Sequence, residues 1–269
     1  MPVDYAILGG DARNGYLTRM LCANGCDARW IDGFDCGVPG VPRGVREELG
    51  EARAAVLNWP YPGNGEILSR LPSGAQVYFC GPAAPEGISR RLRSVNLWAD
   101  EQLLAENAWL TAEGAISAAM AAGDASLREC ACMVIGWGRI GRALTEMLVG
   151  LSARVTVASR SERGRNGAVM RGAQSVATEE IAEALPGKKL VFSTPPARVL
   201  GRAELEHADR DALIVDLASP PYGVDLEAAQ ALNLRAWREP KLPGRYCPYS
   251  AARALMRAIF RAGGGICRE

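Results

Sequence analysis

The residues VIGWGRIG, at positions 134–141, place the spacing G-x-G-x-x-G directly after an apolar run and before a helical pattern. Each glycine has a mechanical role, since Gly136 allows a tight turn, Gly138 lets the backbone approach a pyrophosphate, and Gly141 lets helix and strand pack closely. Free N–H groups at the positive end of the helix then hold the pyrophosphate. The stretch predicts a dinucleotide-binding loop made of Gly136, Trp137, Gly138, Arg139, Ile140 and Gly141.

Short apolar runs alternate with helical patterns along almost all of the 269 residues. Strands joined by helix-length segments pair in parallel, and the crossovers cover both faces of the sheet. A second strand–glycine–helix opening, AILGGDARNGYL, lies at 6–17. We therefore predict an α/β fold of two Rossmann-like, doubly wound parallel sheets with a cleft between them. The expected domains are 1–112 plus 248–269 for the substrate, and 113–247 for the dinucleotide.

The apolar runs and their Gly and Pro stops place the individual elements. Residues 100–125 are expected to be helical, with a break near Thr111, where Thr111 is an N-cap candidate and Glu113 falls in the first turn. The segment 34–50 is rich in Gly and Pro and is expected to be irregular. Strands are expected over 3–10, 26–34, 54–60, 75–82, 131–136, 153–160, 189–196, 212–219 and 232–239, and further helices over 15–25, 139–151 and 250–264.

Composition excludes several classes of partner. The chain has 31 basic and 30 acidic residues, so it carries no global field that would attract nucleic acid or a membrane surface. No apolar run approaches the ~18 residues that span a bilayer. The first ten residues lack the charged-then-apolar layout of a signal peptide. We expect a soluble, cytoplasmic protein that binds neither nucleic acid nor membrane.

The cysteines and the histidine give no metal site. None of the 8 cysteines forms C-x-x-C, and His207 is the only histidine. A structural zinc site needs four converging ligands, so no metal is expected, and the cysteines are interpreted as thiols in a reducing compartment. His207 lies in a polar connector, AELEHADRDAL, and is interpreted as a surface residue.

The strand after the glycine loop indicates which dinucleotide binds. NAD enzymes usually end this strand with Asp or Glu, which binds the ribose 2′-hydroxyl. Here the strand ends VASRSERGR, with Ser159, Arg160 and Ser161 in the place of the acid. Arginine can bind a 2′-phosphate with two hydrogen bonds, and serines can donate to it. The sequence favours NADP, while Glu162 keeps NAD open.

Later strands end in STPP (193–196) and DLAS (216–219). The carboxyl ends of parallel strands form the wall of the ligand crevice in such sheets. The residues expected to line the ribose and nicotinamide are Thr194, Pro195, Ala218 and Ser219. Asp216 has two open interpretations, a site residue or a structural carboxylate that bonds the backbone.

Several stretches together resemble one family, the A subunits of dipicolinate synthase. The similar stretches are ILGGDARN, ENAWLTAEGAI, VIGWGRIG, DLASPPYGVD and KLPGRYCPYSAA. They occur in order over residues 3 to 260, and TAEGAI is more specific than the glycine loop. More distantly, the layout is similar to that of alanine and D-2-hydroxyacid dehydrogenases.

The resemblance implies an oxidoreductase that forms pyridine-2,6-dicarboxylate, the calcium-binding acid of bacterial spores. The substrate would be a dihydrodipicolinate derived from 4-hydroxy-tetrahydrodipicolinate, and NAD(P)+ would accept the hydride. The resemblance also implies that the partner is the flavoprotein-like B subunit of dipicolinate synthase, and that the location is the mother-cell cytoplasm of a sporulating bacterium. A homo-oligomer is left open.

A dicarboxylate substrate needs cations and N–H donors, and the first opening supplies them. Gly9 and Gly10 expose N–H groups at a helix start, and Arg13 is expected to reach the substrate. Asp11 could act as a base or hold Arg13. Ser250, at the start of the last helix, is the other expected carboxylate ligand. Weaker candidates for the same site are Thr111, Glu113, Lys241 and Arg245.

Two alternatives to this function stay open at the level of sequence. One is an NADP-dependent dehydrogenase or reductase of another small acid on the same scaffold. The other is a non-catalytic, cofactor-binding subunit whose partner performs the chemistry. No histidine–carboxylate dyad is expected, because His207, the only histidine, lies in a polar connector far from the strand ends. This fits the oxidation of a dihydropyridine, in which aromatisation drives hydride loss and a weak base or water suffices.

Overall fold

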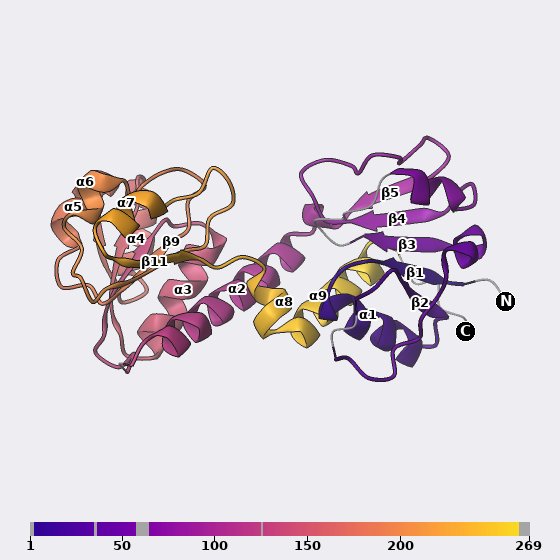
Figure 1. Ribbon diagram of the computed structural model, residues 1–269, viewed down its shortest axis with the longest axis horizontal. Helices are drawn as coiled ribbons and strands as arrows, with labels where there is room; N and C mark the ends of the chain where they lie inside the picture. The colour runs from indigo at the N-terminus through magenta and orange to yellow at the C-terminus, as the bar shows by residue number, and fades with distance from the viewer. Residues whose placement is uncertain (1–2, 35–36, 58–64, 125, 264–269) are drawn as a thin grey trace. The chain divides into compact units, whose positions relative to one another are not determined.

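The computed structural model describes residues 3–34, 37–57, 65–124 and 126–263. It divides into two compact units, shown in Figure 1: a first unit of Met1–Asn107 with Cys247–Glu269, and a second unit of Ala108–Tyr246. The second unit is therefore inserted in the sequence of the first, and the chain passes from one unit to the other twice. Each unit is built on its own parallel sheet.

The sheet of the first unit has the strand order β2-β1-β3-β4-β5, and its neighbouring strands are parallel. The order reverses between β1 and β3, so the topological switch point of this sheet lies at their carboxyl ends. The strands are β1 (Tyr5–Leu8), β2 (Ala28–Ile31), β3 (Ala54–Leu57), β4 (Gln76–Phe79) and β5 (Arg93–Asn96).

Helices cover one face of this sheet, where Leu97 of a 3-10 turn also packs, and two other 3-10 turns cover the opposite face. Tyr5 and Ile7 pack against Leu17 of α1 (Ala12–Ala23) and Leu255 of α9 (Pro248–Arg261). Ala6 and Leu8, the alternate residues of β1, belong to the core on the opposite face. The 3-10 elements are η1 (Arg46–Glu51), η2 (Gly65–Arg70) and η3 (Leu97–Ala99).

The sheet of the second unit has the order β11-β10-β9-β6-β7-β8, again with parallel neighbours. This is the order of dinucleotide-binding sheets, and its switch point lies between β6 and β9. The strands are β6 (Ala131–Ile135), β7 (Arg154–Ala158), β8 (Gln174–Val176), β9 (Leu190–Ser193), β10 (Leu213–Asp216) and β11 (Arg235–Arg238).

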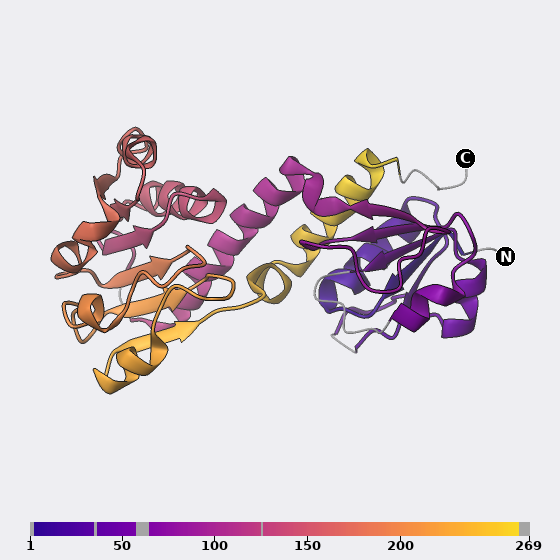
Figure 2. The same cartoon turned by 90° about the horizontal axis from the view of Figure 1, so that it is seen from above.

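Both faces of the second sheet are covered (Figure 2). Cys132 and Val134 face a core shared with α2, α3 and α4, whereas Met133 and Ile135 face α5, α6 and α7. This alternation is the two-residue period of a strand buried on both sides. The helices are α2 (Glu101–Ala122), α3 (Arg139–Gly150), α4 (Glu162–Val169), α5 (Ile181–Ala184), α6 (Arg202–Leu205), α7 (Leu226–Ala231) and α8 (Leu242–Tyr246), with η4 (Thr178–Glu180) before α5.

The prediction of two α/β, Rossmann-like parallel-sheet domains is confirmed. The predicted helix break at Thr111 is wrong, because α2 is one continuous helix and Thr111 lies buried in its interior. The alanine-rich sequence around it favours helix, and Ala112 and Ala115 pack into the core of the second unit. Cys26 is disulfide-bonded, so its interpretation as a thiol is also wrong.

Candidate nucleotide and substrate sites

The three glycines of the loop after β6 lie in different surroundings. Gly136 has a φ of 98°, and a Cβ there would lie 2.4 Å from Thr194 Oγ1. A Cβ on Gly141 would lie 2.1 Å from the Gly136 carbonyl oxygen, so Gly141 is required for α3 to pack against the loop. A Cβ on Gly138 would meet nothing within 4 Å. The loop is therefore packed at both ends and open at Gly138, the position where a pyrophosphate would approach.

The residues at the end of β7 surround the start of α4. Ser159 is buried, and Ser161 is the N-cap of α4, with its Oγ accepting from Gly164 N at 3.1 Å. Arg165 Nη1 donates to the carbonyls of Ser159 and Arg160, both at 3.0 Å, which fixes the turn. Arg160 is exposed, and its guanidinium has no partner among the residues that the structure describes.

Trp137 packs on α4 and does not point away from the protein. A Cβ on Gly167 would lie 2.8 Å from Trp137 Nε1, and the Arg171 guanidinium lies 5.5 Å from the ring centroid. Trp137 thus offers the loop its main-chain N–H group while its side chain joins the core of the second unit. Arg139 is exposed and Ile140 half-buried in the first turn of α3.

The carboxyl ends of β9 and β10 complete this edge. Thr194 Oγ1 donates to the Ile135 carbonyl at 2.8 Å, which ties the end of β9 to the start of the glycine loop. Pro195 and Ala218 are half-buried and Ser219 is exposed. These positions lie at the ends of strands beside the switch point, and they remain the predicted lining of the ribose and nicotinamide.

Asp216 is structural. Its carboxylate is buried and accepts from the backbone N–H groups of Ala218, Gly223 and Val224 at 3.2–3.3 Å, and Arg238 Nε lies 3.5 Å away. Three backbone donors and a cation occupy its oxygens, so Asp216 holds the loop after β10 in place. Of the two interpretations that the sequence left open, the structure supports the second.

In the first unit, the loop after β1 is fixed by the side chains below it. Gly9 and Gly10 have φ values of 56° and 80°. The Gly9 carbonyl accepts from Trp30 Nε1 at 2.6 Å and from Asn14 Nδ2 at 2.7 Å. A Cβ on Gly10 would lie 2.3 Å from Asn14 Nδ2, so the close approach requires glycine. The sequence analysis missed Asn14 and Trp30, because their role depends on contacts across the loop.

Asp11 and Arg13 form an ion pair beside this loop. Asp11 is the N-cap of α1, and its Oδ1 accepts from Arg13 N at 3.1 Å. Arg13 Nε donates to Oδ1 and Nη2 to Oδ2, both at 2.8 Å. Burial raises the pKa of Cys80, which follows β4, to about 12, and the charge of Arg13 opposes this rise. The guanidinium therefore lies on the carboxyl edge of the sheet.

The start of α9 lies at the same edge as the start of α1. The Tyr16 and Tyr249 rings contact edge-on with centroids 5.6 Å apart, and near the other end Asn24 Nδ2 lies 3.7 Å from Met256 Sδ. Both pairs join residues of similar position in the two helices, so α1 and α9 run parallel. Ser250, in the first turn of α9, is half-buried at the edge that carries Arg13.

The weaker candidates fall elsewhere. Glu113 lines a pocket of about 610 Å³ on the second unit, formed with apolar residues of α2 and α3. Arg245 is ion-paired with Glu239. Lys241 is exposed, as is His207, which agrees with the surface interpretation of the histidine. Thr111, Glu113, Lys241 and Arg245 all belong to the second unit, whereas Arg13 belongs to the first.

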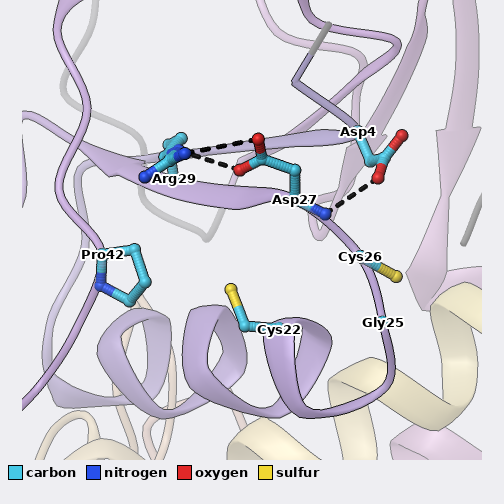
Figure 3. Close-up of a pocket in the computed structure, with 7 residues that line it drawn as sticks. All are labelled: Asp4, Cys22, Gly25, Cys26, Asp27, Arg29 and Pro42. Atoms are coloured by element: carbon cyan, nitrogen blue, oxygen red, sulfur yellow. Dashed lines mark hydrogen bonds and ion pairs between the residues drawn. The ribbon is translucent and has the colours of Figure 1, made fainter. Parts of the chain in front are cut away.

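A second cavity of about 370 Å³ lies at the amino edge of the first sheet (Figure 3). It is lined by Cys22, Asp27 and Arg29 among others, and Asp4 accepts from Asp27 N at 2.8 Å. Its charged groups pair with one another: Arg29 Nε lies 2.8 Å from Asp27 Oδ1. Ligands of such sheets bind at the carboxyl edge, so this pocket is not the candidate site.

The side chains described give no group of three or more His, Cys, Asp or Glu residues arranged to hold a metal ion. Within the same residues, no helix has the length and apolar character needed to cross a membrane.

No protein-family model matches the chain. The A subunit of dipicolinate synthase from Bacillus subtilis (strain 168) is 26% identical over 281 residues, which cover 95% of this chain and 94% of that protein. The crystal structure of the A subunit of dipicolinate synthase from Bacillus halodurans superposes with a TM-score of 0.82 at 22% identity, covering 99% of this chain and 98% of that one.

More distant structures share the two-domain layout. The transhydrogenase of Sinorhizobium meliloti superposes with a TM-score of 0.71 at 16% identity, covering 96% of this chain and 93% of that one. L-alanine dehydrogenase gives 0.66 at 13% identity, with 96% and 89% covered. These matches show the fold, which is that of dehydrogenases with two Rossmann-like domains. The resemblance inferred from the motifs is thereby confirmed: over nearly its whole length, the chain is similar to the A subunits of dipicolinate synthase.

Proposed function

We propose that this protein oxidises a dihydrodipicolinate to pyridine-2,6-dicarboxylate, with NADP+ as hydride acceptor. The observation that carries the dinucleotide part is the loop after β6, where Gly136 and Gly141 are packed and Gly138 alone faces open space. The similarity to the A subunit of dipicolinate synthase over 95% of the chain supports the choice of substrate.

The end of β7 supports NADP over NAD. This strand is followed by Ser159, Arg160 and Ser161, without the carboxylate that binds a free 2′-hydroxyl and repels a 2′-phosphate. Arg160 is exposed and unpaired among the described residues, and Ser161 stands at the N-terminus of α4. A 2′-phosphate placed there would meet a cation and two hydroxyl groups.

The first unit supplies the features that a dicarboxylate needs. Two helices begin side by side at the carboxyl edge of its sheet, α1 with Arg13 and α9 with Ser250. One carboxylate of the substrate would bind the Arg13 guanidinium, and the other would accept from Ser250. Asp11, the remaining residue predicted to be catalytic, lies beside Arg13.

The bound nicotinamide supplies a two-electron acceptor. The loop 136–141 would hold the dinucleotide, and Arg13 and Ser250 would bind and orient the two carboxylates of the substrate. The balanced reaction would convert dihydrodipicolinate and NADP+ to dipicolinate, NADPH and H+. Aromatisation of the ring drives the reaction, so the reaction does not require a histidine base, and His207 is exposed on the surface. The flavoprotein-like B subunit of dipicolinate synthase, as partner, and the cytoplasm of a sporulating mother cell, as location, belong to the same proposal.

An absorbance assay tests the proposal. The purified chain is incubated with 4-hydroxy-tetrahydrodipicolinate and either NADP+ or NAD+, with and without the flavoprotein-like partner, and pyridine-2,6-dicarboxylate and reduced nicotinamide are both measured. We expect equal amounts of the two products, with a preference for NADP+. If the chain turns over another small acid and not this substrate, the proposed substrate is wrong. If neither cofactor supports turnover until the partner is added, the chain is a non-catalytic subunit.

The choice of cofactor has its own variant. Arg160→Ala should raise the KM for NADP+ by about tenfold to a hundredfold, the value of a hydrogen bond to a charged group, and leave that for NAD+ within about twofold. Arg163→Ala, which removes an exposed arginine one turn further on, is the matched control. An equal effect of Arg160→Ala on both cofactors would remove Arg160 from the 2′-phosphate site.

A further inference from the structure

We propose that Asp11 is a positioning residue, which holds Arg13 in the orientation that binds a substrate carboxylate, and that it is not the proton acceptor of the reaction. This inference rests on the proposed function, because it assigns a role within the same substrate site. The sequence left two roles open for Asp11, as a base or as the residue that holds Arg13, and the inference chooses the second.

The geometry of the Asp11 carboxylate carries the first step. Oδ1 accepts from Arg13 N at 3.1 Å and from Arg13 Nε at 2.8 Å, while Oδ2 accepts from Arg13 Nη2 at 2.8 Å. Both oxygens are therefore already hydrogen-bonded to one residue. A proton taken up by either oxygen would break a bond to the guanidinium and leave that cation without its counter-charge in a half-buried site.

The geometry of the Arg13 guanidinium carries the second step. Its Nε and Nη2 edge is turned toward Asp11, and only 17% of the side chain is exposed. Nη1 has no hydrogen-bond partner among the residues that the structure describes. Because the guanidinium is planar and rigid, fixing one edge also fixes the direction of the remaining N–H groups. Asp11 thus determines where Nη1 points.

The position in the fold carries the third step. Asp11 is the N-cap of α1, and the loop before it is locked by Trp30 and Asn14. The pair is therefore anchored to the sheet at the switch point, the edge where such sheets bind ligands. A pair fixed in this way is organised before the substrate arrives, which reduces the entropy lost on binding.

The chain contains a second Asp–Arg ion pair, similar to Asp11–Arg13, that does not lie at the switch point. Asp27 and Arg29 have the same D-x-R spacing, with Arg29 Nε 2.8 Å from Asp27 Oδ1 and Nη2 3.3 Å from Oδ2. They lie at the amino edge of the sheet, at the start of β2, as Figure 3 shows. Asp27→Asn therefore removes a comparable ion pair from the same unit without touching the candidate site.

The test compares Asp11→Asn with Asp27→Asn in the full chain. Asparagine keeps an oxygen that caps α1 and removes the charge that holds Arg13, so the helix start is retained. For Asp11→Asn we expect about a tenfold rise in substrate KM and in the Kd of pyridine-2,6-dicarboxylate, with kcat within about twofold and the Kd of NADP+ unchanged. Asp27→Asn should leave all four constants within about twofold of wild type.

Arg13→Lys is the second variant, which keeps the positive charge but loses the planar guanidinium that donates two hydrogen bonds to Asp11. It should raise the KM as Asp11→Asn does, and it serves if Asp11→Asn does not fold. A fall in kcat of about a hundredfold or more at unchanged KM for Asp11→Asn would make Asp11 the proton acceptor and overturn the inference. Constants equal to wild type would overturn it too. Wild-type protein that neither binds nor forms the dicarboxylate would refute the proposed function instead.

Discussion

The three glycines of the loop after β6 differ in what a side chain would meet. Gly138 has a φ of −77°, which any residue can adopt, and open space beyond it. Gly141 faces the carbonyl of Gly136 at a distance that excludes a methyl group. At the scale of single residues, the packing of the loop therefore requires glycine at Gly141, and the proposed pyrophosphate site assigns the binding requirement to Gly138.

Two substitutions separate these requirements. Gly138→Ala should leave the thermal midpoint unchanged and weaken NADP+ binding by at least about tenfold, or ~1.4 kcal/mol, because the methyl group fills the space the pyrophosphate needs. Gly141→Ala should lower the free energy of unfolding by about 1–3 kcal/mol through overpacking. Calorimetric titration and thermal unfolding measure the two effects. Unchanged nucleotide affinity in Gly138→Ala would locate the cofactor elsewhere.

The sequence predicted where the candidate residues lie in the fold better than it predicted their contacts. The loop 136–141 and the turn 159–161 follow from glycine spacing and from strand ends, which are local features. The role of Asp216 depends on the N–H groups of Gly223 and Val224, which only the folded loop brings to it. Cys80 follows β4 and Arg13 follows β1, yet the charge of Arg13 acts on the Cys80 thiol. No local pattern in the sequence indicates that these two residues are neighbours.

At the scale of elements, Asp100 connects two helices of the first unit. Its Oδ1 accepts from Gln102 N and Leu103 N at the start of α2, and its Oδ2 pairs with Arg261 in the last turn of α9 at 2.7 Å. Burial acts to raise the pKa of Asp100, but the bonds from Leu103 N, Arg261 and Gln102 N outweigh it. The pKa therefore lies below the ordinary 3.8.

A lowered pKa means that Asp100 stabilises the fold above pH 3.8, and that this contribution is lost as the pH falls through the folded-state value. Asp100→Ala should lower the free energy of unfolding by about 1 kcal/mol at pH 7, the usual value of a lost cap. The difference from wild type should shrink in acid. Asp100→Asn keeps the cap and loses the ion pair, so its free energy of unfolding should lie between those of wild type and Asp100→Ala. Urea unfolding at several pH values measures this, and a difference that grows in acid would contradict the assignment.

The strands that the sequence missed are edge strands. β5 (RSVN) and β8 (QSV) are short and contain exposed or half-buried residues, so they lack the apolar runs that mark β1 or β6. They are strands because β4 and β7 offer free hydrogen-bonding edges. Their identity depends on pairing with a distant segment, which periodicity does not encode.

At the scale of the whole molecule, the two ligands are assigned to different units. Hydrogen exchange of the intact protein tests this assignment. NADP+ should slow exchange of amides in 136–141 and 159–161 and leave 9–13 unchanged, whereas pyridine-2,6-dicarboxylate should slow exchange in 9–13. Protection by NADP+ of residues 9–13 alone would reverse the roles of the units.

The insertion of the second unit into the first also fixes an order of events during translation. The ribosome makes residues 108–246 before it makes α9, whose Ala252, Leu255 and Ile259 belong to the core on one face of the first sheet. All strands of the second unit are therefore synthesised before the first unit can bury the apolar surface that α9 covers. The half of the protein that is made first is thus completed last. Until α9 emerges, the apolar surface beside α1 that α9 will cover is the surface a chaperone would hold.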